Sequence, residues 1–267
     1  MIIVKIGGSE GTGHEAICAD LARHIQSGRR IIVVHGGSHD TNVLSEALGH
    51  PPRFVTSVSG HTSRYTDRRT MEIFMMAVAG KMNTLIVENL QRLGVNALGL
   101  SGIDGRLLQA KRKDAIRIIE DGKKKMLRDD YTGKIEQVNT ELLRALLEAG
   151  YTPVIAPIAL ADTGDAVNCD GDRAAAMIAG ALDAETYVNF TNVPGLLKDI
   201  DDPNSLIREI PRGQLEKFEA YAQGRMKKKI MGAQEALDGG VKEIRLASGK
   251  AENPLANALA GECTVIG

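Results

Sequence analysis

The sequence predicts an α/β fold in which a mainly parallel sheet is covered by helices on both faces. The first observation behind this prediction is an alternation of short apolar runs, typical of strands buried on both faces, with longer helix-like segments. The second is that the first two apolar runs end in glycine pairs, Gly7-Gly8 and Gly36-Gly37. Glycines between a strand and a helix let an anion approach the backbone N–H groups closely, so two such loops are candidates for holding one anion between them.

The expected elements follow one another in a regular order. Strands are expected at residues 2–6, 31–34, 95–100, 153–158, 186–190 and 243–246, where apolar side chains dominate. Helices are expected at residues 15–26, 40–47, 67–93, 140–149, 172–182 and 226–237. Gly28, Gly94 and Gly239 mark the ends of three helices, and Thr66 is the expected N-cap of the long helix.

Residues 106–128 interrupt this rhythm with a run of positive charge. They hold nine Lys or Arg against three acids, which gives +6 in a chain whose net charge is -1. A turn at residues 120–122 predicts a β-hairpin outside the main sheet. So much local charge attracts an acidic partner, and the alternative is a solvated face without one.

Composition excludes several classes of protein. With 267 residues and 43% hydrophobic content the chain can bury a substantial core. We expect a cytoplasmic protein with no membrane and no nucleic acid among its partners, because no apolar run reaches the roughly 18 to 20 residues that span a bilayer and the net charge is near zero. Cys18, Cys169 and Cys263 are widely spaced and lack a C-x-x-C pairing, which argues against a disulfide framework and a zinc site.

No linker, low-complexity stretch or internal repeat divides the chain. We therefore expect two lobes on one continuous sheet, residues 1–160 and residues 161–267.

Two lysines and one carboxylate form the candidate catalytic set. A carboxylate acceptor is already ionised at neutral pH, so its phosphorylation needs positioning and charge neutralisation rather than a general base. Lys5 is expected on the acceptor side of the transferring phosphoryl group and Lys229 on the leaving-group side, with Asp172 holding the two ammonium groups. Arg64 and Asn168 are candidates for binding a second carboxylate of the acceptor.

These residues resemble the amino-acid kinase family, and specifically its acetylglutamate kinase branch. The resemblance rests on Lys5-x-Gly7-Gly8, His35-Gly36-Gly37, Arg64, Asn168-x-x-x-Asp172 and Met226-x-x-Lys229. It implies a three-layer αβα sandwich of the carbamate kinase type. It also implies an enzyme that phosphorylates a carboxylate with ATP and Mg2+. No carboxylate cluster suggests a protein cage for a metal, so the phosphates are expected to hold the Mg2+.

The resemblance also implies roles for individual residues. Lys5, Lys229 and Asp172 would be catalytic, and Gly36, Gly37, Arg64 and Asn168 would contact the acceptor. ATP would be bound by Gly7, Gly8, Thr191, Asn192, Gly195, Leu196, Met226 and Lys227. The first lobe would then serve acceptor binding and dimerisation, and the second lobe ATP binding.

Four further segments resemble the [LysW]-aminoadipate kinases of lysine biosynthesis more closely. They are Ser63-Arg64-Tyr65-Thr66-Asp67-Arg68, Leu100-Ser101-Gly102-Ile103-Asp104-Gly105-Arg106, Asp130-Tyr131-Thr132-Gly133 and Gly224-Arg225-Met226-Lys227. Such enzymes take 2-aminoadipate whose amino group is joined to a small acidic carrier protein, and the basic stretch offers it a docking surface at Lys111, Arg112, Lys113, Lys123, Lys124 and Lys125. The resemblance further implies a homodimer without arginine feedback.

Other functions stay open at this point. An acetylglutamate kinase of arginine biosynthesis, or an enzyme serving both pathways, is the main alternative, because glutamate and aminoadipate differ by one methylene group. A non-catalytic sensor would keep the glycine loops but have little need of both lysines. A dinucleotide-dependent oxidoreductase would share the alternation of strands and helices, but the sequence lacks a correctly spaced G-x-G-x-x-G fingerprint.

Overall fold

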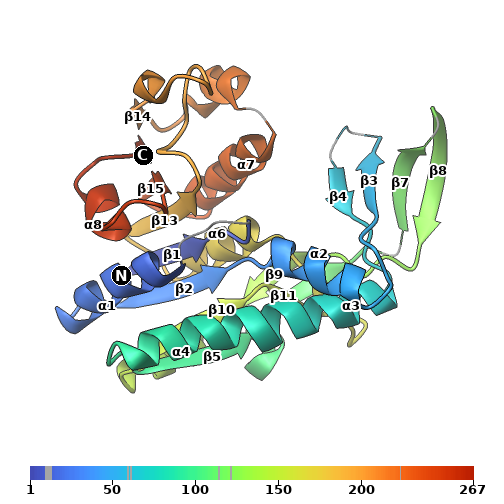
Figure 1. Ribbon diagram of the computed structural model, residues 1–267, viewed down its shortest axis with the longest axis horizontal. Coiled ribbons are helices and arrows are strands. Elements are labelled where there is room, and N and C mark those ends of the chain that lie inside the picture. Colours follow the sequence, from blue (N-terminus) through green and yellow to red (C-terminus); the bar gives the residue numbers. More distant parts are fainter. Residues whose placement is uncertain (10–13, 59, 61, 114, 121, 223) are drawn as a thin grey trace.

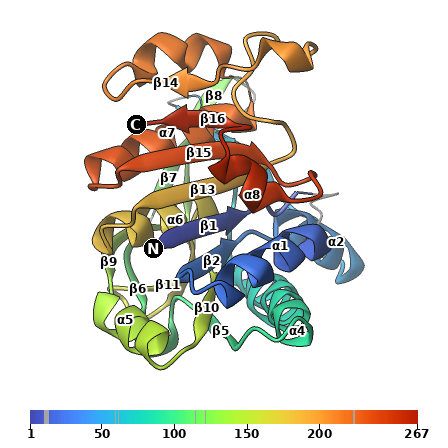
Figure 2. The same cartoon turned by 90° about the vertical axis from the view of Figure 1, so that its left-hand side faces the viewer.

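One eight-stranded sheet runs through the molecule, in the order β14-β16-β15-β13-β1-β2-β10-β5 (Figure 2). The computed structural model describes residues 1–9, 14–58, 60, 62–113, 115–120, 122–222 and 224–267. The strands are β1 (Ile2–Ile6), β2 (Ile31–His35), β5 (Ala97–Ser101), β10 (Thr152–Ala156), β13 (Thr186–Thr191), β14 (Glu209–Ile210), β15 (Glu243–Ser248) and β16 (Thr264–Ile266). Neighbouring strands are parallel except for β15 and β16, so the mainly parallel sheet expected from the sequence is confirmed.

Helices cover both faces of this sheet, which makes three layers (Figure 2). α1 (His14–Gln26), α4 (Thr84–Arg92) and α8 (Pro254–Leu259) lie on one face, and α5 (Thr140–Glu148), α6 (Gly171–Ala181) and α7 (Arg225–Asp238) lie on the other. Apart from the long helical run at residues 68–92, the other helical segments are α2 (Ser38–Ala47), η2 (Asp104–Arg106), η3 (Pro203–Ser205) and η4 (Leu215–Tyr221). The alternating side chains of β1 explain its apolar sequence, because Ile2 and Val4 pack against α1 while Ile3 packs in the cluster that contains α6.

The long helix expected at residues 67–93 is present as one helical run of three parts. α3 (Arg68–Met75) and α4 are joined by a π-helical segment, η1 (Met76–Asn83). Phe74, Val78, Met82, Ile86 and Leu90 are all buried, at a constant spacing of four. In an α-helix each such step would rotate the side chain by about 40° away from the sheet, and the wider π turn offsets this drift.

The predicted N-cap of this helix was wrong by one residue. The Asp67 side chain accepts a hydrogen bond from the Thr70 backbone N–H at 2.7 Å, so Asp67 caps the helix. Thr66 is fully buried and its own N–H donates to the Asp130 carboxylate.

The helical run Arg68–Arg92 is, among the described residues, the single one long and apolar enough to span a membrane by length and composition. Half of its most apolar window is buried within the protein. The run therefore packs one side against the core of the protein and leaves the other side at the surface.

Two four-stranded sheets extend the molecule to one side. The first has the order β12-β11-β6-β9, with β6 (Leu108–Arg112), β9 (Gly133–Val138), β11 (Ile158–Ala161) and β12 (Ala166–Asn168). The second, which we call the projecting sheet, has the order β4-β3-β7-β8, with β3 (Phe54–Ser57), β4 (Thr62–Arg64), β7 (Ala115–Glu120) and β8 (Lys123–Arg128) (Figure 1).

The basic stretch is divided between these two sheets. β7 and β8 form the expected antiparallel hairpin outside the main sheet, although residue 121 at its turn lies outside the described residues. β6, in contrast, pairs with β9 and belongs to the other sheet. The expected hairpin is therefore confirmed for β7 and β8, while the earlier part of the basic stretch lies in the other sheet.

Candidate active site

Lys5, Asp172 and Lys229 meet at one point, as the sequence predicts. The Lys5 Nζ lies 2.7 Å from Asp172 Oδ1, and the Lys229 Nζ lies 3.2 Å and 3.3 Å from the two carboxylate oxygens. The three side chains are only 8%, 12% and 12% exposed. Residues from opposite ends of the chain thus form one nearly buried cluster, which we call the lysine pair site.

Each member is placed by a different element. Lys5 lies near the carboxyl end of β1, where ligands gather in parallel sheets. Asp172 is in the first turn of α6, and the Asp170 side chain accepts the N–H groups of Asp172 and Arg173 as the helix cap, which leaves the Asp172 carboxylate for the lysines. Lys229 is on α7, which begins after Gly224 at φ 53° and ψ -120°, a conformation that favours glycine.

An ion pair between α6 and α7 supports this arrangement. The Arg173 Nε donates to the Glu235 carboxylate at 2.7 Å, and a second guanidinium nitrogen pairs with the other carboxylate oxygen. This two-point contact fixes the helix that carries Lys229 against the helix that carries Asp172.

Asn189 and Tyr187 complete the site, and sequence reasoning missed both. Asn189 lies beside Lys5 in the register of β1 and β13, so the two side chains share a face of the sheet. Its Nδ2 donates to Asp172 Oδ1 at 3.1 Å, and its Oδ1 accepts from Lys229 at 2.9 Å. The Tyr187 hydroxyl accepts from Asn189 and donates to the Asp172 carbonyl oxygen. The sequence could have indicated both, because their polar groups stand within the otherwise apolar strand at residues 186–190.

The lysine pair site has two ammonium groups and one carboxylate, so one positive charge has no negative partner within it. Burial alone would raise the pKa of Asp172, but the ammonium groups of Lys5 and Lys229 hold it well below its usual range. Burial, together with repulsion from Lys5, lowers the pKa of Lys229 to about 8 despite the Asp172 carboxylate. A bound anion would remove this imbalance.

The two glycine loops lie directly against each other beside this site. A Cβ atom on Gly8 would lie 2.2 Å from the Gly37 nitrogen, and one on Gly36 would lie 2.7 Å from the Gly8 nitrogen. Gly7 is half-buried at the end of β1, and the Gly36 N–H donates to the Ile6 carbonyl oxygen. Backbone approach of this kind requires glycine, so the loops are glycine-rich because they pack on one another as well as near a ligand.

Arg64 and Asn168 line a cavity of about 480 Å³ that reaches Asp170 and Arg173, the residues on either side of the Gly171-Asp172 pair, but is not lined by Lys5, Asp172 or Lys229 themselves. Its wall also includes Lys113, Lys134, Cys169 and Asp170. The Arg64 side chain is held by the Ser38 carbonyl oxygen at 3.2 Å and by the Phe54 ring at 5.0 Å. Its Nη1 is buried without a hydrogen-bond partner, which is the state expected of a guanidinium awaiting a carboxylate.

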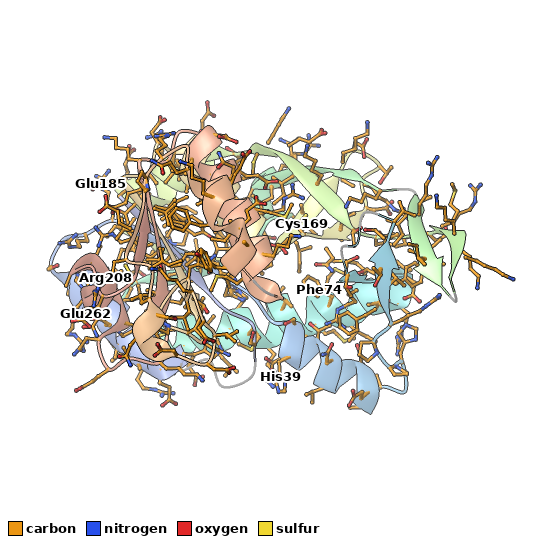
Figure 3. The ribbon with its side chains drawn as sticks, turned by 90° about the horizontal axis from the view of Figure 1, so that it is seen from above. His39, Phe74, Cys169, Glu185, Arg208 and Glu262 are labelled. Atoms are coloured by element: carbon orange, nitrogen blue, oxygen red, sulfur yellow. The ribbon has the colours of Figure 1, made fainter. Side chains whose placement is uncertain are left out.

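Asn168 is fixed from behind. Its Nδ2 donates to Thr66 Oγ1 at 3.2 Å, and Thr66 in turn donates its N–H to the buried Asp130. Figure 3 shows the neighbouring Cys169 in the interior, between α7 and the projecting sheet. Burial raises the pKa of Cys169 to about 12, and all three cysteines are buried free thiols, so none is an activated nucleophile.

The residues expected to bind ATP occupy several environments. Thr191 ends β13 and accepts from the Val193 N–H, Asn192 is exposed, and Met226 and Lys227 lie in the first turn of α7. Gly195 and Leu196 pack against Thr264, whose hydroxyl accepts the Leu196 N–H at 2.8 Å. Leu196 is 1% exposed and belongs to the core, so its side chain has a packing role, and nucleotide contact stays a prediction for this group.

The basic residues expected to dock a carrier lie on two different sheets. Lys123, Lys124 and Lys125 are exposed on β8, and Lys111 and Lys113 are exposed at and after the end of β6. A docking role for Arg112 stays a prediction, and its side chain already has partners within the protein. Its side chain is 13% exposed, stacks 3.6 Å from the Tyr131 ring centre and donates to Asp165 at 2.9 Å, so its charge is used inside the protein.

The model of the amino acid kinase family matches residues 1–248. The chain belongs to the amino acid kinase family. A [LysW]-aminoadipate kinase from Deinococcus radiodurans is 56% identical over 100% of this chain and 91% of its own length. A second, from Thermus thermophilus, is 51% identical over 100% of both chains. An acetylglutamate kinase from Methanopyrus kandleri is 39% identical over 91% of this chain and 93% of its own.

Solved structures of amino acid kinase type share the fold. N-acetylglutamate synthase from Neisseria gonorrhoeae has a TM-score of 0.79 at 25% identity and covers 99% of this chain and 58% of its own. Carbamate kinase from Giardia lamblia has a TM-score of 0.68 at 13% identity and covers 99% of this chain and 97% of its own. The predicted three-layer fold of carbamate kinase type is thus confirmed.

As an amino acid kinase, this protein uses ATP as its phosphoryl donor. The lysine pair site suits the phosphates of ATP because it holds an unneutralised positive charge beside two glycine loops. Within the described ranges, no group of three or more His, Cys, Asp or Glu is arranged to hold a metal ion.

The lowered pKa of Lys229 predicts an alkaline limit to activity. In the free enzyme Lys229 loses its proton as the pH rises through about 8, so kcat/KM for ATP should fall about tenfold per pH unit above that value. The fall in kcat should begin at higher pH, because bound phosphates stabilise the ammonium form. Steady-state rates from pH 6 to 10 measure both profiles. A flat kcat/KM up to pH 10 would exclude Lys229 as an essential cation.

Replacement of Lys5 by methionine should separate catalysis from stability. Lys5→Met removes one charge from the site, and kcat should fall by about 10² to 10³. The free energy of unfolding should stay the same or rise, because Lys229 and Asp172 then balance each other. Turnover and urea unfolding are measured side by side, with the exposed Lys242→Met as control. A Lys5→Met enzyme with near-normal kcat would refute the assignment.

Proposed function

We propose that this chain transfers the γ-phosphoryl group of ATP to the side-chain carboxylate of 2-aminoadipate whose amino group is joined to a carrier protein, as a [LysW]-aminoadipate kinase of lysine biosynthesis. Relatives with that name match the whole chain at 56% and 51% identity, above the 39% of the acetylglutamate kinase. The single observation that carries the proposal is the combination of the lysine pair site with a nearby cavity lined by Arg64, whose buried Nη1 has no hydrogen-bond partner.

The acceptor is a dianion, and the site offers a cation for each end. Arg64 and Asn168 bind its main-chain carboxylate, which leaves the side-chain carboxylate to extend toward Lys5. A carboxylate oxygen attacks the γ-phosphorus while the bond to the ADP oxygen breaks, and no proton moves. Lys5 neutralises charge on the acceptor side and Lys229 on the leaving-group side. Mg2+, held by the phosphates, supplies further charge neutralisation.

The buried imidazole next to the glycine loop is not a general base in this scheme. Burial lowers the pKa of His35 to about 4, so the ring is neutral at working pH. It bonds to protein groups through both nitrogens. The reaction depends on fixed charges and backbone donors, as a preionised acceptor allows.

We extend the proposal to the carrier protein and the assembly. Lys113 lies on the wall of the acceptor cavity, Lys111 is exposed on β6 just before it, and Lys123, Lys124 and Lys125 are exposed on β8 of the projecting sheet. An acidic carrier would be steered onto these lysines while its linked amino acid enters the cavity. The enzyme would act in the cytoplasm as a homodimer, with residues 1–160 serving the acceptor and the partner copy and residues 161–267 serving ATP.

N-acetylglutamate 5-kinase activity, alone or together with the first activity, is the second candidate. The observation in its favour is the 39% identity to an acetylglutamate kinase over 91% of this chain. The cavity of about 480 Å³ does not distinguish two acceptors that differ by one methylene, worth only about 1 to 3 kcal/mol.

The acceptor is identified by trapping the acyl phosphate. With MgATP and hydroxylamine, carrier-linked aminoadipate should give hydroxamate at a kcat/KM well above that of free N-acetylglutamate and of carrier-linked glutamate. Arg64→Lys should raise KM for the acceptor more than KM for ATP, because a lysine cannot replace the two-point guanidinium contact. Preference for N-acetylglutamate would instead assign the enzyme to arginine biosynthesis.

Charge reversal on the projecting sheet tests carrier docking. Lys123→Glu/Lys124→Glu should raise KM for the carrier-linked acceptor about tenfold at low salt, with the difference shrinking as salt screens it. KM for ATP should not change. The control with equal charge change is Lys198→Glu/Lys242→Glu, at exposed positions of the C-terminal half. Equal KM values for the two double variants would remove β8 from the docking surface.

A further inference from the structure

A buried polar network lies beneath the second glycine loop. Asn83, the last residue of the π-helical segment, is 6% exposed, and its Nδ2 donates to Val154 O at 2.9 Å. The same amide nitrogen lies 3.0 Å from His35 Nε2. On the other side of the ring, His35 Nδ1 lies 2.9 Å from Gly36 O. His35 itself is fully buried, so both ring nitrogens depend on protein partners.

These partners fix the tautomer of His35. A carbonyl oxygen can only accept, so the hydrogen must be on Nδ1 for the bond to Gly36. An amide NH2 group can only donate, so Nε2 must be bare to accept from Asn83. Asn83 and Gly36 therefore select the same neutral form of the ring from opposite sides.

The bond to Gly36 orients the peptide that enters the phosphate-binding loop. In a trans peptide the C=O and the next N–H point in opposite directions, so a Gly36 carbonyl held by His35 directs the Gly37 N–H away from the ring. The Gly37 nitrogen lies against Gly8 of the first loop. Neither glycine has a side chain to resist rotation of this peptide, so the His35 bond adds a directed restraint to the packing of Gly8 against it.

The π-helical segment brings three side chains under this peptide. A Cβ on Gly37 would lie 2.8 Å from Val78 Cγ2 and 3.4 Å from Met82 Cγ, so both side chains pack directly on the loop. Gly99 on β5 leaves room for the third, because a Cβ there would lie 2.1 Å from Asn83 Oδ1. The widened helical turn and a glycine on a neighbouring strand thus both accommodate Asn83.

We propose that Asn83 is a positioning residue for phosphoryl transfer: by holding His35 in the Nδ1–H tautomer it fixes the Gly36–Gly37 peptide, so that the Gly37 N–H stays available to the anion bound between the glycine loops. The identity of that anion rests on the proposed function, whereas the tautomer and the peptide orientation do not. Asn83 acts through His35 and touches no substrate.

The test combines nitrogen NMR of the ring with kinetics. Long-range proton–nitrogen spectra of the wild-type enzyme, with the His35 signals assigned by their loss in His35→Gln, should show Nδ1 protonated and Nε2 bare at pH 7. Asn83→Leu should show the other tautomer or a mixture, and kcat should fall by about 10² while KM for ATP changes less than threefold, as for a misplaced catalytic donor. The tautomer reports on the proposal whichever acceptor the enzyme uses.

Gln91→Met is the matched control. Gln91 lies on the same helical run, and its side-chain amide also donates to a strand carbonyl, Ala97 O at 2.9 Å, away from the glycine loops. It should keep the wild-type tautomer and kcat. Equal losses in Gln91→Met and Asn83→Leu, or a single Nδ1–H form in Asn83→Leu, would overturn the proposal. If Asn83→Leu fails to fold, Asn83→Ser withdraws the contact with less strain, and a wild-type ring protonated at Nε2 refutes the proposal without any variant.

Discussion

The central feature of the structure is the unbalanced charge of the nearly buried lysine pair site, where the ammonium groups of Lys5 and Lys229 face the single carboxylate of Asp172. A buried charge without a partner costs several kcal/mol, so a protein keeps such a cluster only when something else repays the cost. Asn189 donates a hydrogen bond to the carboxylate and Tyr187 accepts one from Asn189, but neither side chain adds a charge. The site is thus most stable with an anion present, and the same surplus that weakens the empty site stabilises a transferring phosphoryl group.

Arg64, on the wall of the neighbouring cavity, is a second cation whose charge is not neutralised. Arg64 is held by a carbonyl oxygen and an aromatic ring, neither of which neutralises it, and one guanidinium nitrogen has no partner. Asn168 is fixed through Thr66 and Asp130, a chain of contacts that joins three separate strands and loops. This end of the cavity is therefore held in place by protein contacts before any ligand binds, which lowers the cost of ordering its side chains on binding.

The features that could be predicted from the sequence are those that depend on residues close together in the chain. A strand buried on both faces reads as an uninterrupted apolar run, and glycine pairs and isolated lysines at its end are visible without a structure, so the sheet, the loops and the lysine pair site were predicted correctly. Asn189 was missed because its role comes from its register beside Lys5. Thr66 and Asp67 are both good caps, and only tertiary contacts decide between them. Arg112 stands among surface cations in the sequence, but in the structure it stacks on the Tyr131 ring and donates to the Asp165 carboxylate.

The place of β1 in the sheet has a consequence for how the chain is made. β1 pairs on one side with β2, which follows soon after it, and on the other with β13, which lies far along the chain. While the protein is being synthesised, one edge of β1, whose side chains are apolar except for Lys5, stays unpaired until the second half emerges. Contacts so distant in sequence make folding slow. Premature release from the ribosome would yield fragments that are inactive and prone to aggregate, so this kinase assembles its catalytic charges and protects its central strand in a single late step.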